Sequence, residues 1–297
     1  MNHLYLADST KKDYKNMLGA IAGDIIGSMR EKRNHALYRL SKMTIRDDAA
    51  MQRERAYTKR EDFDLFEGYN NFTDDTVMTL AVADAIMNHQ PYGATIKAYG
   101  RRFPDRGYGG RFQKWLKSDD MTPYNSYGNG SAMRVSPVAF AFDTLEEVLA
   151  EAKASAEVTH DHPQGIEGAQ AVAAAVFMAN KGESKEAIRE YLIETYEYPL
   201  QDTIKDIRPG YKFDATCEGS VPEAIIAFLD ATNYEHTIRL AISLGGDADT
   251  QAAIAGAIAQ AFYKKIPENI VTQTKAILGT GLWQLVEGFQ ETYGVVY

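Results

Sequence analysis

The sequence predicts an all-α protein, folded as a single compact domain of ten or more helices. Alternating β-branched and aromatic residues bounded by turn residues, the pattern typical of strands, are nearly absent from its 297 residues. Apolar runs instead recur at helical spacing behind Thr, Asp, Ser or Pro, which favour helix starts. No internal repeat, low-complexity tract or Pro- or Ser-rich linker divides the chain, so we expect residues 1–297 to form one domain.

Composition narrows the class of protein further. Apolar residues make up 45% and charged residues 25% of the chain, which is ordinary for a globular protein. The formal net charge of -9 provides no general electrostatic attraction for nucleic acid. The single cysteine, Cys217, excludes an internal disulfide framework and fits a reducing compartment. Residues 1–18 contain no continuous apolar stretch and later apolar runs are short, which predicts a cytoplasmic protein without a membrane segment.

The first predicted helix, residues 17–28, carries small residues at every fourth position: Gly19, Gly23 and Gly27. Small residues at that spacing share one face of a helix and allow a neighbouring helix to approach closely. Asp24 stands in the middle of this apolar run and requires a partner, because an unpaired buried carboxylate is costly. Glu31 follows Asp24 by seven residues, two helical turns later on a similar face.

A basic segment follows this helix. Residues 29–60 contain ten Lys or Arg against four Asp or Glu, a local charge of +6 in a chain of -9. We interpret the stretch from about 32 to 60 as an insertion, either a solvated helical or loop excursion, or a lid or partner-binding arm. It is also the one route by which nucleic acid is expected to bind, if it binds at all.

Two segments open apolar helices with several oxygen-bearing side chains each. Residues 72–76 read Phe-Thr-Asp-Asp-Thr ahead of a helix to 87, and residues 243–250 read Ser-Leu-Gly-Gly-Asp-Ala-Asp-Thr ahead of a helix at 252–261. Capping and the helix dipole explain one acid or hydroxyl at either start. Each segment offers three or more, however, and two facing starts would supply four carboxylates to a two-metal site. Such hard oxygen ligands suit Mg²⁺ or Mn²⁺.

The remaining apolar runs predict helices at 94–99, 112–116, about 145–158, 166–180 and 224–230, and one or two closing helices within 271–297. Three turns between them carry polar residues. Asp105 lies in Pro-Asp-Arg-Gly and is either an ordinary turn residue or a functional acid. Residues 128–131, Gly-Asn-Gly-Ser, form either a plain surface turn or a nest whose N–H groups bind phosphate. His160 and His162 flank Asp161 at a helix junction, as caps or as members of a site.

These motifs together resemble the ADP-ribosylglycohydrolase family, which includes dinitrogenase reductase-activating glycohydrolases and the ADP-ribosylarginine and ADP-ribosylserine hydrolases. The matching stretches, in the order of the family, are residues 19–28 with Glu31, 72–76, 127–134, Thr159-His160 and 244–250. The resemblance implies an all-α fold with two divalent cations in a cleft. It assigns the metal ligands to Thr73, Asp74, Asp75, Asp247, Asp249 and Thr250.

The same resemblance implies the other roles in the cleft. The loop of Gly128, Asn129, Gly130 and Ser131 is similar to the one that holds the diphosphate and ribose of ADP-ribose, and His160 resembles the histidine that lines the same cleft. Glu31 matches the catalytic or metal-associated glutamate of the family, and Asp105 matches an acid that contacts the scissile arginine.

The implied reaction is hydrolysis at C1″ of the distal ribose of an ADP-ribosylated protein or small molecule, with Glu31 assisting proton transfer. Among the linkages, ADP-ribosyl-arginine is favoured over ADP-ribosyl-serine, because Glu31 and Asp105 suit a cationic guanidinium. Two alternatives stay open. One is an HD-type metal phosphohydrolase built on His160-Asp161, and the other is a non-catalytic ADP-ribose-binding relative that keeps the fold alone.

Overall fold

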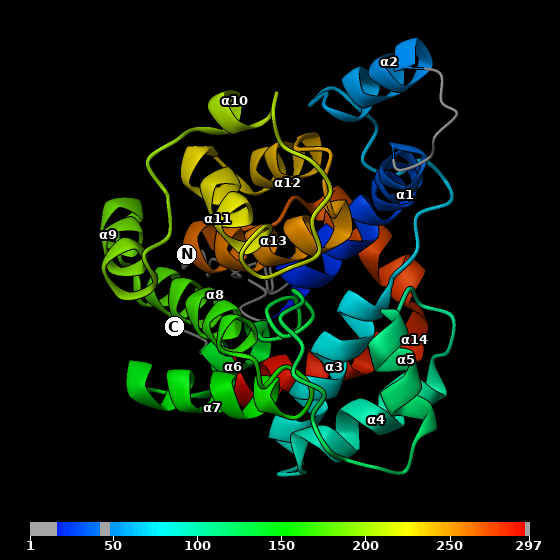
Figure 1. Cartoon of the computed structure of the whole chain (residues 1–297). Helices are drawn as coiled ribbons and strands as arrows, with labels where there is room; N and C mark the ends of the chain where they lie inside the picture. Colours follow the sequence, from blue (N-terminus) through cyan, green and yellow to red (C-terminus); the bar gives the residue numbers. More distant parts are fainter. Residues whose placement is uncertain (1–16, 42–47, 295–297) are drawn as a thin grey trace, which may run out of the picture.

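The computed structural model describes residues 17–41 and 48–294, which fold into one bundle of helices (Figure 1). The helices are α1 Leu18–Ser41, α2 Asp48–Thr58, α3 Asp74–Met87, α4 Tyr92–Arg102, α5 Gly110–Lys117, α6 Ser136–Ala141, α7 Leu145–Glu157, α8 Pro163–Lys181, α9 Lys185–Tyr196, α10 Ile204–Ile207, α11 Val221–Asp230, α12 Tyr234–Ser243, α13 Ala248–Tyr263 and α14 Glu268–Tyr293. The described residues contain no strand beyond an isolated bridge between Gly128 and Thr216. The predicted all-α fold is confirmed.

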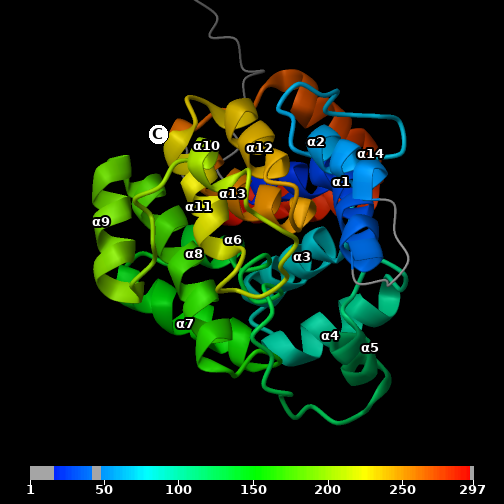
Figure 2. The same cartoon turned by 45° about the horizontal axis from the view of Figure 1, so that its top comes forward.

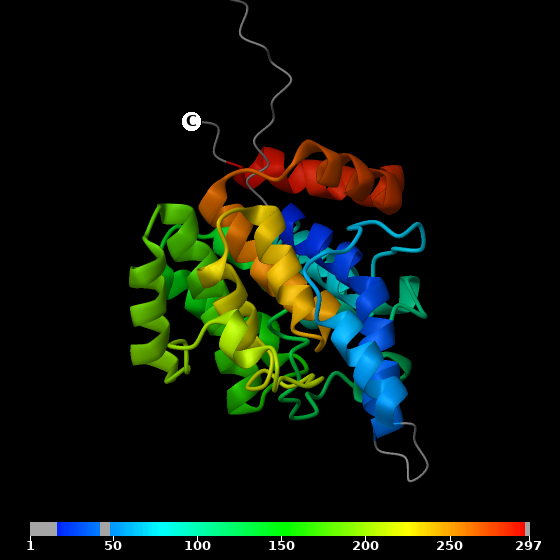
Figure 3. The same ribbon diagram turned by 90° about the horizontal axis from the view of Figure 1, so that it is seen from above.

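Helix α13 lies at the centre of the bundle. It packs against α1, α8, α11 and α12, and two views show these helices around it (Figures 1 and 2). Most of its side chains are small and apolar, and residues 248–261 are all buried, as expected of a helix with no solvent-facing side. Helix α14 runs along one side of the bundle, where it contacts α1 and α3 (Figure 3). Gly279, with φ of 70°, divides α14 into two helical parts.

The glycines of α1 form the close contact with α13 that their spacing predicts. A β-carbon at Gly23 would lie 2.1 Å from the carbonyl oxygen of Ala252, and one at Gly19 would lie 2.4 Å from that of Gly256. Any side chain there would force the two helices apart. The contact fixes the register of the two helices, so the acids of α1 lie beside the start of α13.

The predicted insertion consists of the C-terminal part of α1 together with the whole of α2. Its residues 42–47 lie outside the described residues. The two helices project from the bundle side by side (Figure 3), and most of the described side chains here are exposed. The guanidinium groups of Arg30 and Arg33 lie over the ring of Tyr57, at 4.9 and 4.8 Å from its centre. After α2, Nζ of Lys59 donates a 2.8 Å hydrogen bond to the carbonyl of Tyr211. That this stretch is an insertion stays a prediction.

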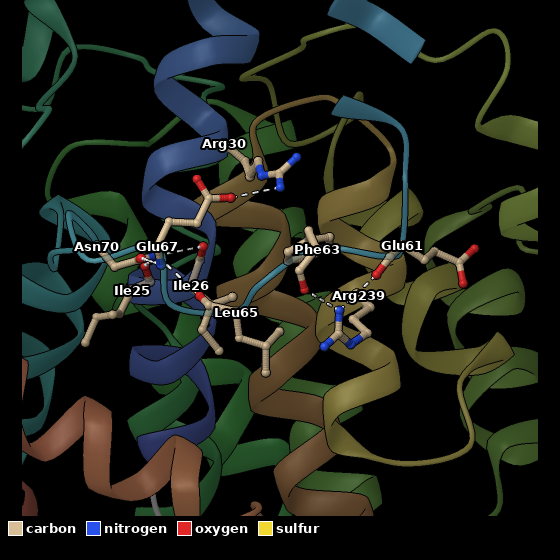
Figure 4. Close-up of polar contacts among 9 residues, drawn as sticks. All are labelled: Ile25, Ile26, Arg30, Glu61, Phe63, Leu65, Glu67, Asn70 and Arg239. Carbon is tan, nitrogen blue, oxygen red and sulfur yellow. Dashed lines mark hydrogen bonds and ion pairs between the residues drawn. The ribbon is translucent and has the colours of Figure 1, made fainter. Parts of the chain in front are cut away.

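An extended connection from α2 to α3 delivers the Thr-Asp-Asp motif to α1 (Figure 4). Its backbone groups require partners, because no helix satisfies them. Nδ2 of Asn70 donates to two carbonyl oxygens of α1, and Arg30 forms a 2.9 Å ion pair with Glu67. Nη1 of Arg239, from α12, donates to two carbonyl oxygens of the connection, those of Glu61 and Phe63. These contacts hold the end of the connection, and therefore the start of α3, against α1.

No helix among residues 17–41 and 48–294 combines the length and apolar character needed to cross a membrane. A cytoplasmic location stays a prediction.

Candidate active site

Asp24 finds its partners at the start of α3. Its carboxylate accepts hydrogen bonds from the backbone N–H of Thr73 (3.0 Å) and of Thr76 (3.1 Å), and from both of their hydroxyl groups. These N–H groups belong to the first helical turn, which has no acceptor within its own helix. A carboxylate of α1 therefore caps α3 from outside, while Thr73 is the N-cap residue within the chain.

The buried acids of three helices converge beside this cap. One carboxylate oxygen each from Asp24, Asp75 and Asp249 lies within 4.8 Å of the others. All three side chains are buried, and Oδ1 of Asp75 has no hydrogen-bond partner among the described residues. A buried carboxylate oxygen without a donor is costly, and a cation between the three acids would remove that cost. The donor set consists of hard oxygens, which fits Mg²⁺ or Mn²⁺.

The start of α13 supplies the other predicted acids. Gly245, with φ of 75°, makes the tight bend expected of the Gly-Gly pair. Oδ2 of Asp247 accepts a 2.8 Å hydrogen bond from Nδ2 of Asn129, so this acid contacts the Gly-Asn-Gly-Ser loop directly. Asp249 lies in the cluster with Asp24 and Asp75, and the hydroxyl of the next residue, Thr250, donates to Sδ of Met133 at 3.9 Å. The two helix starts therefore face each other as the sequence analysis expected.

Asp74 lies at the rim of this cluster. Its backbone N–H donates to the carbonyl of Arg106 (2.8 Å), and a β-carbon at Gly107 would lie 3.0 Å from its Oδ1. Asp74 is the partly exposed member of the Thr-Asp-Asp motif. The loop that carries Asp105 is thus held against the cluster. Asp105 itself is exposed with φ of 61°, and its side chain forms no hydrogen bond or ion pair with another described residue.

None of the acids in this cluster forms an ion pair with a Lys, Arg or His of the described residues. Burial raises the pKa of Asp75 well above its usual range, and the neighbouring charges of Asp24 and Asp74 raise it further. The pKa of Asp249 is raised in the same way, by burial and then by Asp75 and Asp247. Such a site favours the binding of a metal ion or another positively charged group.

Glu31, from α1, lies near the same acids. Burial raises its pKa to about 7, with a further contribution from the charge of Asp247. A carboxyl group with that pKa exchanges its proton near neutral pH, which general acid–base chemistry requires. The structure thus brings Glu31 to the predicted metal ligands.

The loop at residues 128–131 offers fewer free amides than its sequence suggests. The N–H of Gly128 donates to Ser126 and that of Asn129 donates to Ala215, so the N–H groups of Gly130 and Ser131 are the two without an acceptor in the described chain. No residue of this loop has a positive φ. The hydroxyl of Ser131 donates to the carbonyl of Gly165 at 2.6 Å, so its hydrogen is not free for a ligand.

His160 packs against the same loop. A β-carbon at Gly130 would lie 3.0 Å from its Nε2, so glycine is required there for space rather than for its dihedral angles. Burial lowers the pKa of His160 well below its usual value, and the charges of Arg134 and Arg111 lower it further. The imidazole is therefore neutral.

Comparison with known proteins identifies the chain's relatives. A family model described as ADP-ribosylglycohydrolase matches residues 11–295. The chain belongs to the ADP-ribosylglycohydrolase family. ADP-ribosylhydrolase ARH3 from Gallus gallus is 30% identical over 289 residues, covering 75% of both chains, and ARH3 from Mus musculus is 29% identical, covering 74% of both. ADP-ribosylarginine hydrolase Tri1 from Pseudomonas putida (strain GB-1) is 28% identical, covering 65% of this chain and 58% of Tri1.

A solved structure, of an "ADP-ribosylglycohydrolase-related protein complex", has the same fold as this ADP-ribosylglycohydrolase. It superposes with a TM-score of 0.66 over 95% of this chain and 99% of its own, at 21% sequence identity. The predicted family, fold and class of enzyme, a hydrolase, are confirmed. The HD-type alternative has no geometric support, because Asp161 is exposed and accepts a hydrogen bond from the backbone of Asn125, while His162 caps α8.

Sequence reasoning about this ADP-ribosylglycohydrolase missed two contributors to the site. Asp24 was expected to need a partner but not to join the acid cluster, and its burial within an apolar helix was the available signal. Tyr211 packs on Gly246, where a β-carbon would lie 2.4 Å from its ring, and its hydroxyl accepts from Gln251 at 2.8 Å. Nothing in the sequence near Tyr211 indicates this position.

Proposed function

We propose that this protein hydrolyses the glycosidic bond at C1″ of the distal ribose in an ADP-ribosylated acceptor. The observation that carries the proposal is the 2.8 Å hydrogen bond between Asn129 and Asp247, which joins the Gly-Asn-Gly-Ser loop to the acid cluster. A ligand with a diphosphate on the free amides of Gly130 and Ser131 would place its terminal sugar at the acids. ADP-ribose has this arrangement, with a diphosphate next to the distal ribose.

The acid cluster fits two divalent cations. We assign their ligands to Thr73, Asp74, Asp75, Asp247, Asp249 and Thr250, with Asp24 beside them. When bound, Mg²⁺ or Mn²⁺ would orient the hydroxyl groups of the distal ribose and make water more acidic. The protein's own part is to hold the sugar in one orientation, because positioning removes much of the entropic barrier to the reaction.

Glu31 is the proposed proton-transfer group. Its raised pKa of about 7 leaves it partly protonated at neutral pH, so its carboxyl group is able to give a proton to the departing acceptor or to take one from water. His160, neutral and against the loop, is assigned to ligand binding rather than to proton transfer.

Arginine is the acceptor that the charge of the cleft favours. A guanidinium is cationic near neutral pH, and carboxylates bind it through charge-assisted hydrogen bonds. Asp105 lies exposed one residue from Arg106, whose carbonyl accepts from Asp74, which is a suitable position for contact with an acceptor at the rim. The name of the relative Tri1 specifies arginine, whereas that of ARH3 does not specify an acceptor.

Turnover of matched ADP-ribosyl-arginine and ADP-ribosyl-serine peptides tests this assignment. We expect release of ADP-ribose that EDTA abolishes, a higher kcat/KM on the arginine peptide, and a loss of about tenfold on that peptide alone for Asp105→Ala, as for one hydrogen bond to a charged group. The control is Asp202→Ala, which removes an exposed acid away from the cleft. A preference for the serine peptide contradicts the acceptor, and the absence of any ADP-ribose release contradicts the activity.

A further inference from the structure

A chain of buried polar side chains leads from the core to the loop at residues 128–131. Nη2 of Arg134 donates a 2.9 Å hydrogen bond to Oγ1 of Thr159, and that oxygen lies 2.7 Å from Nδ1 of His160. Arg134 and Thr159 are 1% and 0% exposed, and His160 is 5% exposed. Water therefore does not compete for these hydrogen bonds.

The chemistry of the three groups fixes the direction of the chain. A guanidinium has donors and no acceptor, so Oγ1 of Thr159 accepts from Arg134. The hydroxyl has one hydrogen, and Nδ1 of His160 is its acceptor within the described residues. A proton on Nδ1 would leave that hydroxyl hydrogen buried without an acceptor, which is costly. Nδ1 is therefore the unprotonated nitrogen, and the proton of the neutral ring is on Nε2.

Nε2 is the nitrogen that faces the loop. It lies 3.0 Å from the position of a β-carbon on Gly130 and 3.8 Å from that on Gly128. No described residue accepts a hydrogen bond from it. The N–H groups of Gly130 and Ser131 also lack protein acceptors. The ring and the loop packed against it therefore carry three donors that have no acceptor among the described residues.

We propose that Arg134 and Thr159 are positioning residues that lock His160 as the Nε2–H tautomer, so that the ring and the loop amides together bind an anionic oxygen of the diphosphate. The identity of the ligand rests on the proposed function, whereas the tautomer does not. The charged groups that face the ring are Arg134 and Arg111, and the ring of Tyr124 lies 6.1 Å away. Both charges are positive, so they oppose a second proton on the ring, and the tautomer alone decides which nitrogen donates.

The first test reads the tautomer without any ligand. Long-range nitrogen–hydrogen NMR correlations distinguish the two tautomers of a neutral imidazole, and the chain has six histidines, among which His160→Gln identifies the signal. We expect the Nε2–H form in the wild type and in Thr159→Ser. In Thr159→Val, which loses the hydroxyl but keeps its shape, we expect the Nδ1–H form to appear. An Nδ1–H ring in the wild type, or an unchanged Nε2–H ring in Thr159→Val, overturns the proposal.

The second test measures the binding of free ADP-ribose by calorimetry, and kcat and KM on an ADP-ribosylated peptide. We expect Thr159→Val to weaken ADP-ribose binding about tenfold. It should raise KM more than it lowers kcat, because the contact of His160 with the diphosphate is present in the bound substrate as well as in the transition state. Thr159→Ser should restore both. The matched control is Thr274→Val, another buried threonine, whose hydroxyl has no partner in the described residues.

These outcomes separate the two proposals. Equal ADP-ribose binding by Thr159→Val and wild type, or an equal loss in Thr274→Val, overturns the positioning role of Arg134 and Thr159. A wild type that binds ADP-ribose but does not hydrolyse the peptide contradicts the proposed function and does not contradict that positioning role. If the wild type binds no ADP-ribose, the ligand is wrong in both proposals. The NMR result still decides the tautomer of His160.

Discussion

Two regions of this molecule gather acidic side chains, and they differ in what neutralises them. In the proposed active-site cleft, Asp24, Asp75 and Asp249 are buried, and no cationic side chain of the described residues forms an ion pair with them. Around Arg30 and Arg239, a surface pocket collects four acids: Glu61, Asp62, Asp64 and Glu67. We call this region the arginine pocket. Here Glu67 pairs with Arg30 at 2.9 Å, and Asp62 pairs with Arg60 at 3.0 Å (Figure 4 shows the first pair).

The difference separates a structural cluster of charges from a functional one. Arg30 is 4% exposed and lies over the rings of Tyr57 and Phe63, which joins α1 and α2. Three of the four acids, Glu61, Asp62 and Glu67, pair with an arginine, so the pocket compensates most of its own charge. The cleft leaves its charges uncompensated, which costs stability unless a cation enters. Buried charges without a partner in the protein therefore indicate the functional region, and the following experiments test that contrast.

The largest effect is expected from neutralising one acid of the cleft. Asp249→Asn keeps the size of the side chain and removes its charge, and we expect kcat/KM to fall by more than about 100-fold, beyond the roughly 10–100-fold typical of partners outside the first coordination shell. In EDTA the same variant should melt at a higher temperature than wild type, because one repelling charge is gone. The measurements are turnover with saturating Mn²⁺ and thermal unfolding in EDTA.

Asp62→Asn is the matched control in the arginine pocket. Its carboxylate is 93% exposed and paired, so neither turnover nor melting in EDTA should change appreciably. If Asp249→Asn behaves like this control, the two acidic regions do not differ in the way described.

A smaller effect is expected from breaking the buried ion pair of the arginine pocket. Arg30→Met should lower the free energy of unfolding by about 3 kcal/mol, at the lower end for a broken buried pair because 28% of Glu67 is exposed. The side chains of Arg60 and its partner Asp62 are 54% and 93% exposed, so Arg60→Met should lower the free energy of unfolding by less than about 1 kcal/mol. Urea unfolding of both variants measures the difference. Equal costs would show that Arg30 is no more important to the fold than a surface residue.

The smallest effect is a pH dependence of the metal-free protein. Raised pKa values mean that folded Asp75, Asp249 and Glu31 hold protons more tightly than the unfolded chain does. Their contribution to stability is complete below about pH 4, where both states are protonated, and is lost as the pH rises through the folded pKa values, of which that of Glu31 is near 7. In EDTA the melting temperature should therefore fall by a few degrees between about pH 5 and 8.

Two comparisons isolate this effect. The lowered pKa of His160 acts in the opposite sense, because it makes stability rise with pH. The dependence of the melting temperature on pH is therefore compared between wild type and Glu31→Gln, and the curve of the variant should be shallower at its alkaline end. Added Mn²⁺ should reduce the fall, because deprotonated ligands bind metal. A melting temperature that rises with pH in EDTA, with the same slope in Glu31→Gln, would contradict the account of the cleft.

The sequence by itself determined the helical fold and the two helix starts. The spacing of Gly19, Gly23 and Gly27 predicts the close helix contact, and the acids at residues 74–75 and 247–249 exceed what capping requires. Such features are local, since they depend on helical periodicity and on the backbone groups left free at a helix terminus.

Only the tertiary structure decided how these local features serve one another. Asp24 and Thr73 are 49 positions apart, and Asn129 and Asp247 are 118 apart, so no local pattern predicts either hydrogen bond. The structure also showed that the hydroxyl of Ser131 bonds to Gly165, and that Gly130 makes room for His160. Hydrogen bonds between distant segments form only once the helices pack, because packing brings the groups together and removes the water that would otherwise satisfy them.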